Sequence, residues 1–136
     1  MRNAHPEGSM SNKTILTVDD EERVLQLIND ILSTKGYDVL TAMSGKEAIR
    51  KSKKSLPDLI VMDIMMPDID GAEAVKLLKE DPTTKDIPIL FLSGIIMKEE
   101  GKSDMDINVG GDFYSALPKP FGADELLTAV DKLLEH

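Results

Sequence analysis

The sequence predicts an α/β fold, a five-stranded parallel sheet with helices on both faces. Two observations predict it. Five short apolar runs alternate with segments of helical periodicity, and parallel strands need crossovers of this kind. One run, Leu59–Met62, is apolar at every position, as a strand buried on both faces is. The 136 residues, 41% of them hydrophobic, suffice for one domain with its own core.

The first half of the chain shows two strands, each followed by a helix. Thr14–Val18 and Tyr37–Thr41 are the β-rich runs. Asp19 and Asp20 are expected at the end of the first strand, and Glu21 and Glu22 in the first turn of the first helix, where negative charge suits its dipole. Ser44 has the spacing of a capping box with Glu47 and opens a second helix. The basic run 50–54 that ends this helix is interpreted as a solvated helix end. The apolar stripe of the first helix consists of Val24, Leu27, Ile28, Ile31 and Leu32.

The second half continues the alternation. After the central strand, Asp70 has capping spacing with Glu73 and opens a third helix. Ile87–Leu92 and Phe113–Leu117 are the fourth and fifth strands, with a weak pattern between residues 95 and 111, where any helix is expected to be short or mobile. A terminal helix follows, striped by Leu126, Leu127, Val130, Leu133 and Leu134.

Composition excludes several function classes. The chain has no cysteine and only two histidines, His5 and His136, at its ends, so thiolate chemistry and histidine-rich metal sites are disfavoured. A net charge of −9 disfavours direct nucleic-acid binding. No apolar run is long enough to cross a membrane, and the expected location is the cytoplasm. Residues 1–12 are expected to be disordered or derived from cloning, and residues 13–136 to form the domain.

Polar side chains follow four of the predicted strands. In the order 2-1-3-4-5, strands one and three are neighbours, so Asp19, Asp20 and Asp63 are expected at one sheet edge. Three crowded carboxylates call for a cation, and Mg²⁺ fits a site with few protein oxygens better than Ca²⁺ does. Ser93 and Lys119 follow the fourth and fifth strands at the same edge. Such a site can accept a phosphoryl group on a carboxylate.

Four motifs in these places resemble those of response-regulator receiver domains of bacterial two-component systems, from about Lys13 to Glu135. They are Val18-Asp19-Asp20-Glu21, Leu59 to Pro67 with Asp70-Gly71, Phe91-Leu92-Ser93-Gly94, and Lys119-Pro120-Phe121. The resemblance implies a flavodoxin-like fold and a phosphorelay function. A histidine kinase or histidine phosphotransfer protein would be the donor, and the output partner is unknown.

The resemblance also implies a role for each site residue. Asp63 would accept the phosphoryl group. Asp20 and Asp63 would bind Mg²⁺ directly, with the backbone carbonyl of Met65, while Asp19 would act mainly through water. Ser93 would be the switch hydroxyl, and Lys119, in a cis peptide with Pro120, would pair with the phosphoryl group. The chain would then catalyse its own phosphorylation and dephosphorylation while serving primarily as a signalling switch.

One position departs from the family. Receivers commonly carry an aromatic switch residue three positions before the lysine, where this chain has Ala116. Either a bulge restores Tyr114 to that place or the aromatic switch is absent. The segment Ile95–Gly111 is hypothesised to form the output surface.

Two other function classes stay open from the residues. One is a phospho-independent interaction module of the same fold. The other is an aspartate-nucleophile phosphatase, although the D-x-D pattern of such enzymes has Met65 in its second place here. The chain ends soon after the last predicted helix, so no output domain is expected within it.

Overall fold

The computed structural model describes residues 13–66, 68–94 and 105–135. The described residues form six strands and four helices. In chain order these are β1 (Thr14–Val18), α1 (Glu22–Ser33), β2 (Asp38–Ala42), α2 (Gly45–Ser55), β3 (Leu59–Asp63), α3 (Gly71–Glu80), β4 (Ile89–Ser93), β5 (Met105–Val109), β6 (Asp112–Pro118) and α4 (Ala123–Leu134). The predicted N-terminal boundary concerns residues 1–12, which lie outside the described ranges.

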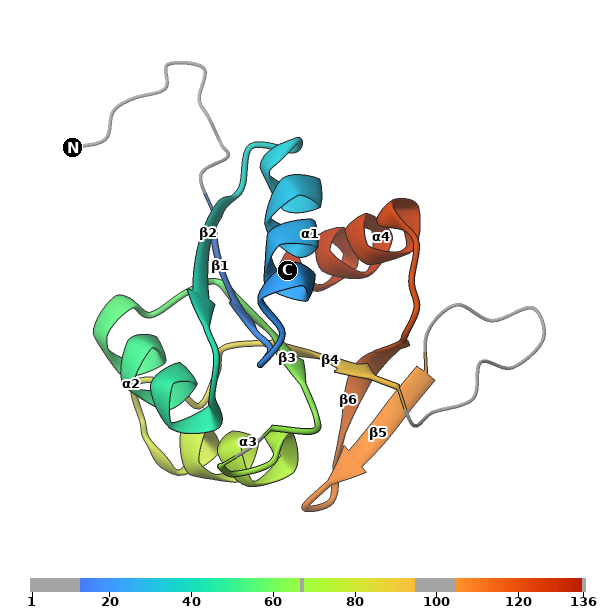
Figure 1. The fold of residues 1–136 in the computed structure, drawn as a ribbon. Coiled ribbons are helices and arrows are strands. Elements are labelled where there is room, and N and C mark those ends of the chain that lie inside the picture. The colour runs from blue at the N-terminus through green and yellow to red at the C-terminus, as the bar shows by residue number, and fades with distance from the viewer. Residues whose placement is uncertain (1–12, 67, 95–104, 136) are drawn as a thin grey trace.

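All strands belong to one sheet, in the order β2-β1-β3-β4-β6-β5 (Figure 1). The pairs β1–β2, β1–β3, β3–β4 and β4–β6 are parallel, which confirms the predicted five-stranded parallel sheet, with β6 as its fifth strand. A sixth strand, β5, pairs antiparallel with β6 at the edge.

The sixth strand lies where the sequence analysis expected at most a short helix. Val109 pairs with Asp112 across a two-residue turn. The turn residues Gly110 and Gly111 have φ angles of 62° and 93°, the left-handed region that a tight hairpin turn requires. The side-chain oxygen of Asn108 accepts a hydrogen bond from the Gly111 N–H at 3.2 Å. The part of the weak segment that the structure describes is therefore a hairpin arm, and residues 95–104 lie outside the described ranges.

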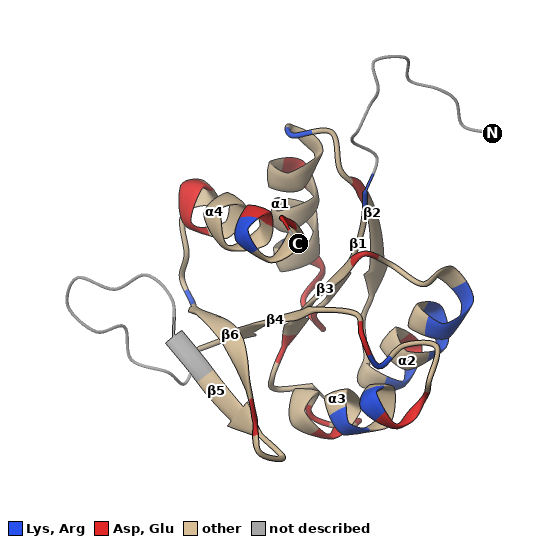
Figure 2. Cartoon of the chain, turned by 180° about the vertical axis from the view of Figure 1, so that it is seen from behind, with Lys and Arg blue, Asp and Glu red and all other residues tan. Residues whose placement is uncertain are grey.

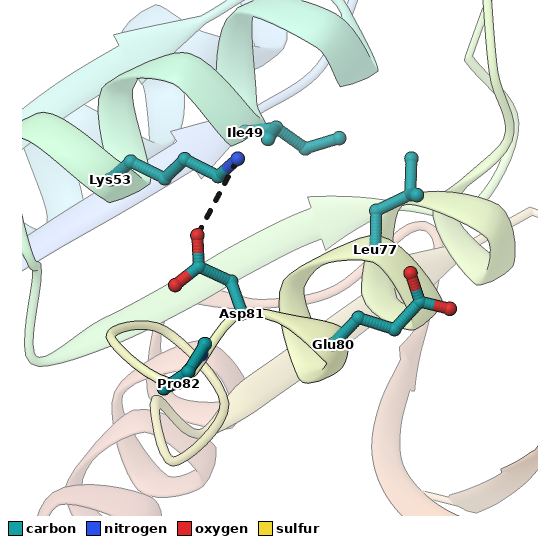
Figure 3. Close-up of a pocket in the computed structure, with 6 residues that line it drawn as sticks. All are labelled: Ile49, Lys53, Leu77, Glu80, Asp81 and Pro82. Carbon is teal, nitrogen blue, oxygen red and sulfur yellow. Dashed lines mark ion pairs between the residues drawn. The ribbon is translucent and has the colours of Figure 1, made fainter.

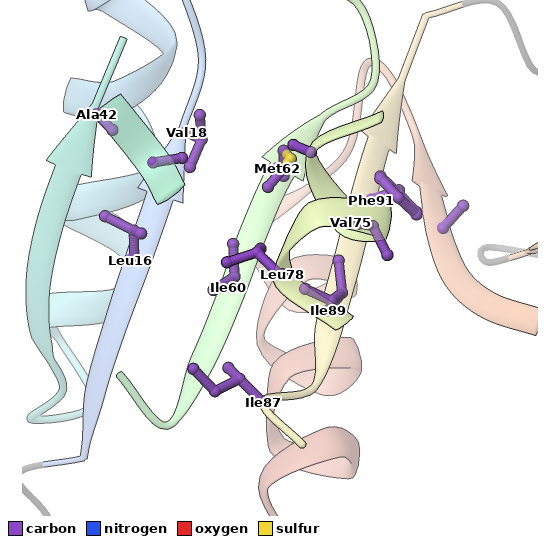
Figure 4. Close-up of a cluster of buried hydrophobic side chains, with 13 residues drawn as sticks. Leu16, Val18, Ala42, Ile60, Met62, Val75, Leu78, Ile87, Ile89 and Phe91 are labelled. Atoms are coloured by element: carbon purple, nitrogen blue, oxygen red, sulfur yellow. The ribbon is translucent and has the colours of Figure 1, made fainter. Parts of the chain in front are cut away.

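Helices cover both faces of the sheet, as predicted. α1 and α4 lie on one face, and α2 and α3 lie on the other (Figure 1). Alternate strand residues point to the two faces, so the core has two layers. The layer under α2 and α3 includes Leu16, Val18, Ile60, Met62, Val75, Leu78, Ile89 and Phe91 (Figure 4). The layer under α1 and α4 includes Ile15, Ile28, Leu32, Leu59, Val61, Leu90, Leu92, Leu117, Leu126 and Val130.

Two helix starts have the predicted caps. The hydroxyl of Ser44 accepts a hydrogen bond from the Glu47 N–H at 3.1 Å, and the carboxylate of Asp70 accepts one from the Glu73 N–H at 2.8 Å. Charge is unevenly spread: acidic residues follow β1 and β3, while basic residues gather on α2 (Figure 2). None of the described helices combines the length and apolar character needed to cross a membrane.

Candidate functional site

The carboxyl ends of β1 and β3 bring three acidic residues together. Val18 pairs with Met62, so the next residues of the two segments, Asp19 and Asp63, lie at the same level of the sheet. Asp20, the next residue, lies beside them. One carboxylate oxygen from each of the three residues lies within 4.8 Å of the others. The structure therefore brings these predicted acids to one place.

The three acids differ in exposure. Asp19 is fully buried and Asp63 is 6% exposed. Asp20 is exposed. A buried carboxylate is costly unless it is paired and hydrogen-bonded, so the partners of the two buried acids define what this site can do.

Lys119 joins the two buried acids. Its Nζ lies 3.0 Å from Oδ2 of Asp19 and 2.9 Å from Oδ2 of Asp63. The lysine reaches them because β6 pairs with β4, and the Lys119 N–H donates to the carbonyl of Ser93 at 2.9 Å just beyond the last paired residues. The peptide between Lys119 and Pro120 is cis, as expected. An ammonium group thus lies between carboxylates from two different strands.

The second oxygen of each buried acid accepts a backbone hydrogen bond. Oδ1 of Asp19 accepts the N–H of Glu21 at 2.9 Å, and Oδ1 of Asp63 accepts the N–H of Met65 at 3.1 Å. Each carboxylate is therefore held in one orientation, by a main-chain donor on one side and by Lys119 on the other.

Charge in the site is not balanced by protein groups alone. Burial raises the pKa of the Asp19 carboxyl, although the Glu21 N–H and Lys119 lower it, and the nearby charge of Asp63 adds to the increase. Burial lowers the pKa of the Lys119 ammonium, but the hydrogen bonds to Asp63 and Asp19 outweigh it, so the pKa is raised overall. Lys119 stays protonated, while three acids face one ammonium.

The donor set fits a hard divalent cation. Three carboxylates and one ammonium leave a formal charge of −2, which one Mg²⁺ balances. Oxygen ligands from a few carboxylates, with water in the remaining positions, are what Mg²⁺ prefers in proteins. The observation that supports this fit is the cluster itself, in which carboxylate oxygens of the three acids lie within 4.8 Å of one another and Asp19 is fully buried.

The other predicted site residues lie close along the same edge. Ser93 is buried at the end of β4, and its carbonyl holds the Lys119 N–H. The side chain of Met65 is 57% exposed, and its N–H bonds to Asp63. The roles assigned to the Ser93 hydroxyl and the Met65 carbonyl stay predictions.

No bulge in β6 brings Tyr114 to the position three residues before Lys119. The β4–β6 pairing runs continuously from Leu90–Ser115 to Ser93–Pro118, and Ala116 is the partner of Phe91. Ala116 therefore keeps the position three residues before the lysine. Tyr114 lies one pleat away on the same face, with its ring 5.9 Å from that of Phe91 in an edge-to-face arrangement and 5.6 Å from Nζ of Lys79.

Two hollows on the surface of the described residues are relevant to the site. One, of about 320 Å³, adjoins the acidic site and is lined by Val24, Leu27, Lys119, Pro120 and Phe121. The other, of about 420 Å³, lies between α2 and α3 and is lined by Ile49, Lys53, Leu77, Glu80, Asp81 and Pro82 (Figure 3). An ion pair of 3.5 Å between Lys53 and Asp81 crosses the second hollow. Because α2 and α3 run antiparallel to the strands, this hollow, at their C-terminal halves, lies at the end of the sheet away from the acids.

Asp68 was not among the site residues predicted from the sequence. Its carboxylate accepts hydrogen bonds from the N–H groups of Gly45 and Lys46, both at 2.9 Å, at the start of α2. An isolated acid in a loop gives no sequence signal for a partner 22 or 23 positions earlier. The apolar residues that line the hollow beside Lys119 were predicted only as parts of other features: Val24 and Leu27 as part of a helix stripe, and Pro120 and Phe121 as part of a motif.

Comparisons with known proteins agree with this geometry. The family model described as "Response regulator receiver domain" matches residues 15–131. The alkaline phosphatase synthesis transcriptional regulatory protein PhoP of Bacillus subtilis is 40% identical over 125 residues, which are 92% of this chain and 50% of PhoP. Response regulator MprA of Mycobacterium leprae is 39% identical over 122 residues, 90% of this chain and 51% of MprA.

A solved structure agrees as well. The chemotaxis protein CheY4 of Vibrio cholerae superposes with a TM-score of 0.76 at 34% identity, covering 91% of this chain and all of that one. The chain spans about half the length of the two curated relatives. With the family match, the shared fold and the acidic site all in agreement, the chain belongs to the response regulator receiver domain family.

Proposed function

We propose that Asp63 is the phosphoacceptor of this receiver domain, with Mg²⁺ held by Asp19, Asp20 and Asp63 and with the carbonyl of Met65 as a further ligand. One observation carries the proposal: Lys119 lies within 3.0 Å of carboxylates from two strands, at a cluster of three acids. A positive group already lies where a phosphoryl group bound to Asp63 would place its charge.

The reaction is a displacement at phosphorus. A carboxylate oxygen of Asp63 attacks the phosphorus of a phosphohistidine. The new O–P bond forms as the N–P bond breaks, and the imidazole leaves with the electron pair and takes up a proton. Lys119 stays charged throughout and offsets the charge on the phosphoryl oxygens. Bound Mg²⁺ supplies further neutralisation of those oxygens.

Orientation is the contribution of the backbone. The Met65 N–H on Oδ1 and Lys119 on Oδ2 keep the Asp63 carboxylate in one rotamer before the donor arrives. Preorganised donors of this kind lower the barrier because they need not reorganise during the reaction. The acyl phosphate adds negative charge and acceptor oxygens, which the Ser93 hydroxyl and Lys119 approach. That movement is the proposed switch.

Receiver domains receive phosphate from histidine kinases or phosphotransfer proteins, and the donor of this chain docks over the hollow beside Lys119. The hollow is lined mainly by apolar side chains, and Leu27 at its rim is 49% exposed. Lys119 lines the hollow and also bonds Asp63, so a donor seated there brings its histidine next to the acceptor. A cytoplasmic location follows from such a donor and stays a prediction.

The β5–β6 hairpin is the proposed output surface within the described residues. Phe113 is 70% exposed on it, and Tyr114 links it to Phe91 in the core under α3. Amide hydrogen exchange in residues 105–118 is expected to change on addition of beryllofluoride, a phosphoryl mimic. Unchanged exchange there would remove the hairpin from the output path.

The phosphoacceptor is tested by intact mass spectrometry after incubation with Mg²⁺ and acetyl phosphate. The parent protein is expected to gain the mass of one phosphoryl group, and Asp63→Asn is expected to gain none. Asp58→Asn is the matched control, because Asp58 lies just before the same strand and its carboxylate accepts the N–H of Thr14, at the opposite end of β1 from Asp19. A parent protein that stays unmodified, or an Asp63→Asn protein that gains the phosphoryl mass, would refute the proposal.

A further inference from the structure

The loop between β3 and α3 follows the acceptor directly and contacts a helix from an earlier part of the chain. We propose that Asp68 is a positioning residue for the reaction at Asp63. Its carboxylate fastens this loop to the N-terminus of α2, and the loop in turn holds the Met65 N–H on the acceptor carboxylate. This inference rests on the proposed function.

The fastening consists of two hydrogen bonds. Oδ1 of Asp68 accepts the N–H of Gly45 and Oδ2 accepts the N–H of Lys46, each at 2.9 Å. These are the first two N–H groups of α2, which have no partner inside the helix. The hydrogen bonds, that of Lys46 first, lower the pKa of the Asp68 carboxyl to about 2. The carboxylate is therefore ionised at neutral pH and able to accept both hydrogen bonds.

The helix also has a cap of its own. Ser44 accepts the N–H of Glu47, the third in the helix, and the Glu47 side chain accepts the N–H of Met43 at 2.9 Å. Residues at the start of α2 therefore cap the helix without any contribution from the loop. The bond from Asp68 differs because its donor and acceptor belong to segments more than twenty residues apart.

Close packing shows that the loop rests on the helix. A Cβ atom placed on Gly45 would lie 2.5 Å from Cγ1 of Ile69 and 3.0 Å from the Ile69 carbonyl oxygen. Only glycine permits this approach. The residue that follows Asp68 therefore touches α2 at the residue whose N–H Asp68 binds.

The loop is held at both of its ends by residues next to the acceptor. The Met65 N–H donates to Oδ1 of Asp63 at 3.1 Å, and the Gly71 N–H donates to the carbonyl of Ile64 at 2.7 Å. Asp68 ties the part between these ends to a third element. Without that tie, the Met65 N–H has more freedom, and the Asp63 carboxylate loses part of its orientation. Misplacement of a reacting group by about 1 Å can reduce a rate about 100-fold.

The test compares Asp68→Ala and Asp68→Asn with Ser44→Ala. The Ser44 variant removes a cap from the same helix but leaves the loop fastened. Phosphorylation of the whole chain by acetyl phosphate is followed at saturating Mg²⁺, with the maximal rate and the half-saturating donor concentration measured separately. Asp68→Ala is expected to lower the maximal rate about 10-fold, a size usual for groups that orient a metal or reacting ligand. Asp68→Asn keeps one acceptor oxygen, so its maximal rate is expected to lie between those of the parent and Asp68→Ala.

Ser44→Ala and Asp68→Ala are expected to lower the free energy of unfolding by similar amounts, because each removes hydrogen bonds from the start of the same helix. The maximal rate of Ser44→Ala is nevertheless expected to stay within about two-fold of the parent's. Amide exchange at Met65 gives a readout that needs no phosphorylation. It is expected to quicken about 10-fold in Asp68→Ala and to stay unchanged in Ser44→Ala.

Two results would overturn the inference: a parental rate with parental Met65 exchange in Asp68→Ala, or equal slowing by Ser44→Ala. If the parent itself takes no phosphoryl group at Asp63, the proposed function and the inference fall together. If the parent is phosphorylated at Asp63 but the Asp68 series is flat, only the inference falls.

Discussion

Replacing Asp19 by Asn is expected to stabilise the fold when no divalent cation is present. Asp19 is fully buried, so its charge has lost its hydration. The amide oxygen of Asn keeps an acceptor for the Glu21 N–H, and Lys119 keeps Asp63 as its partner. The substitution therefore removes a charge while leaving most of the surrounding contacts in place.

The size of the gain follows from the distances. At an effective dielectric constant of about 20, the attraction between Asp19 and Lys119 at 3.0 Å is worth about 5.5 kcal/mol. Repulsion across 4.8 Å costs about 3.5 kcal/mol for each of the other two acids, less for exposed Asp20. Attraction and repulsion nearly cancel, and the cost of burying the carboxylate decides the sign. We expect a gain of about 1 to 2 kcal/mol in the free energy of unfolding, well below the full burial cost because the Glu21 hydrogen bond offsets part of it.

The gain should depend on pH. Burial raises the pKa of the Asp19 carboxyl above 3.8 in the folded state, so the folded protein holds this proton more tightly than the unfolded one. The stability tied to that proton is complete below pH 3.8 and is lost as the pH rises through the raised pKa. The Asn variant has no such loss. Its advantage should therefore be absent below pH 3.8 and complete at neutral pH.

Urea unfolding in EDTA, and again in Mg²⁺, measures both effects. A cation at 100 times its dissociation constant stabilises the parent by about 2.7 kcal/mol, and the variant, with one carboxylate fewer, by less. The advantage of the variant should thus shrink when Mg²⁺ is added. An Asp19→Asn protein less stable than the parent in EDTA would show that the acids stabilise the fold, and would refute the reasoning.

Three further outcomes are expected. Leu27→Asp should slow phosphotransfer from a histidine kinase without slowing transfer from acetyl phosphate, while Leu77→Asp, at the other hollow, should change neither; equal rates in all proteins would exclude docking beside Lys119. Gly111→Ala should lower the free energy of unfolding by about 1 to 2 kcal/mol in urea titrations, because a φ of 93° is unfavourable for alanine, and an unchanged midpoint would contradict the hairpin turn. Tyr37→Phe should lower the free energy of unfolding by about 1 to 2 kcal/mol at pH 7 by removing the hydrogen bond to Asp131. Burial and that bond raise the pKa of Tyr37 to about 12, so the parent alone should lose this stability between pH 10 and 12; parallel pH curves would argue against it.

The sequence predicted that Asp19, Asp20 and Asp63 would lie together because each of them stands at the end of a strand or just after it. The end of an apolar run such as Leu59–Met62 shows in the sequence where the strand ends. Neighbouring parallel strands have their carboxyl ends at the same edge of the sheet, so residues that follow such runs lie close together. No long-range contact had to be guessed beyond the order of the strands. Lys119 followed for the same reason, since its strand is the neighbour of β4.

The hairpin was missed although its signal was present. Ile107-Asn108-Val109 and Asp112-Phe113-Tyr114 flank Gly110-Gly111, and two β-rich runs separated by a Gly-Gly pair are typical of a tight hairpin. The expectation of strict strand–helix alternation directed the interpretation toward a helix. In the described residues, the chain instead covers the β6 edge with an antiparallel strand.

The place of Asp68 could not be predicted in this way. Its partners on α2 depend on how the loop after β3 lies against a helix, and the tight contact of Ile69 with Gly45 decides this. Such contacts arise from tertiary packing and leave no periodic pattern in the sequence.

The position of the phosphoryl group tests the central claim most directly. The protein is incubated with Mg²⁺ and acetyl phosphate and treated with borohydride, which reduces an aspartyl phosphate to homoserine, and its peptides are then sequenced by mass spectrometry. The account predicts homoserine at position 63, formed only when Mg²⁺ is present and greatly reduced in Asp20→Asn. Homoserine at another acidic position, or equal labelling in EDTA, would contradict it.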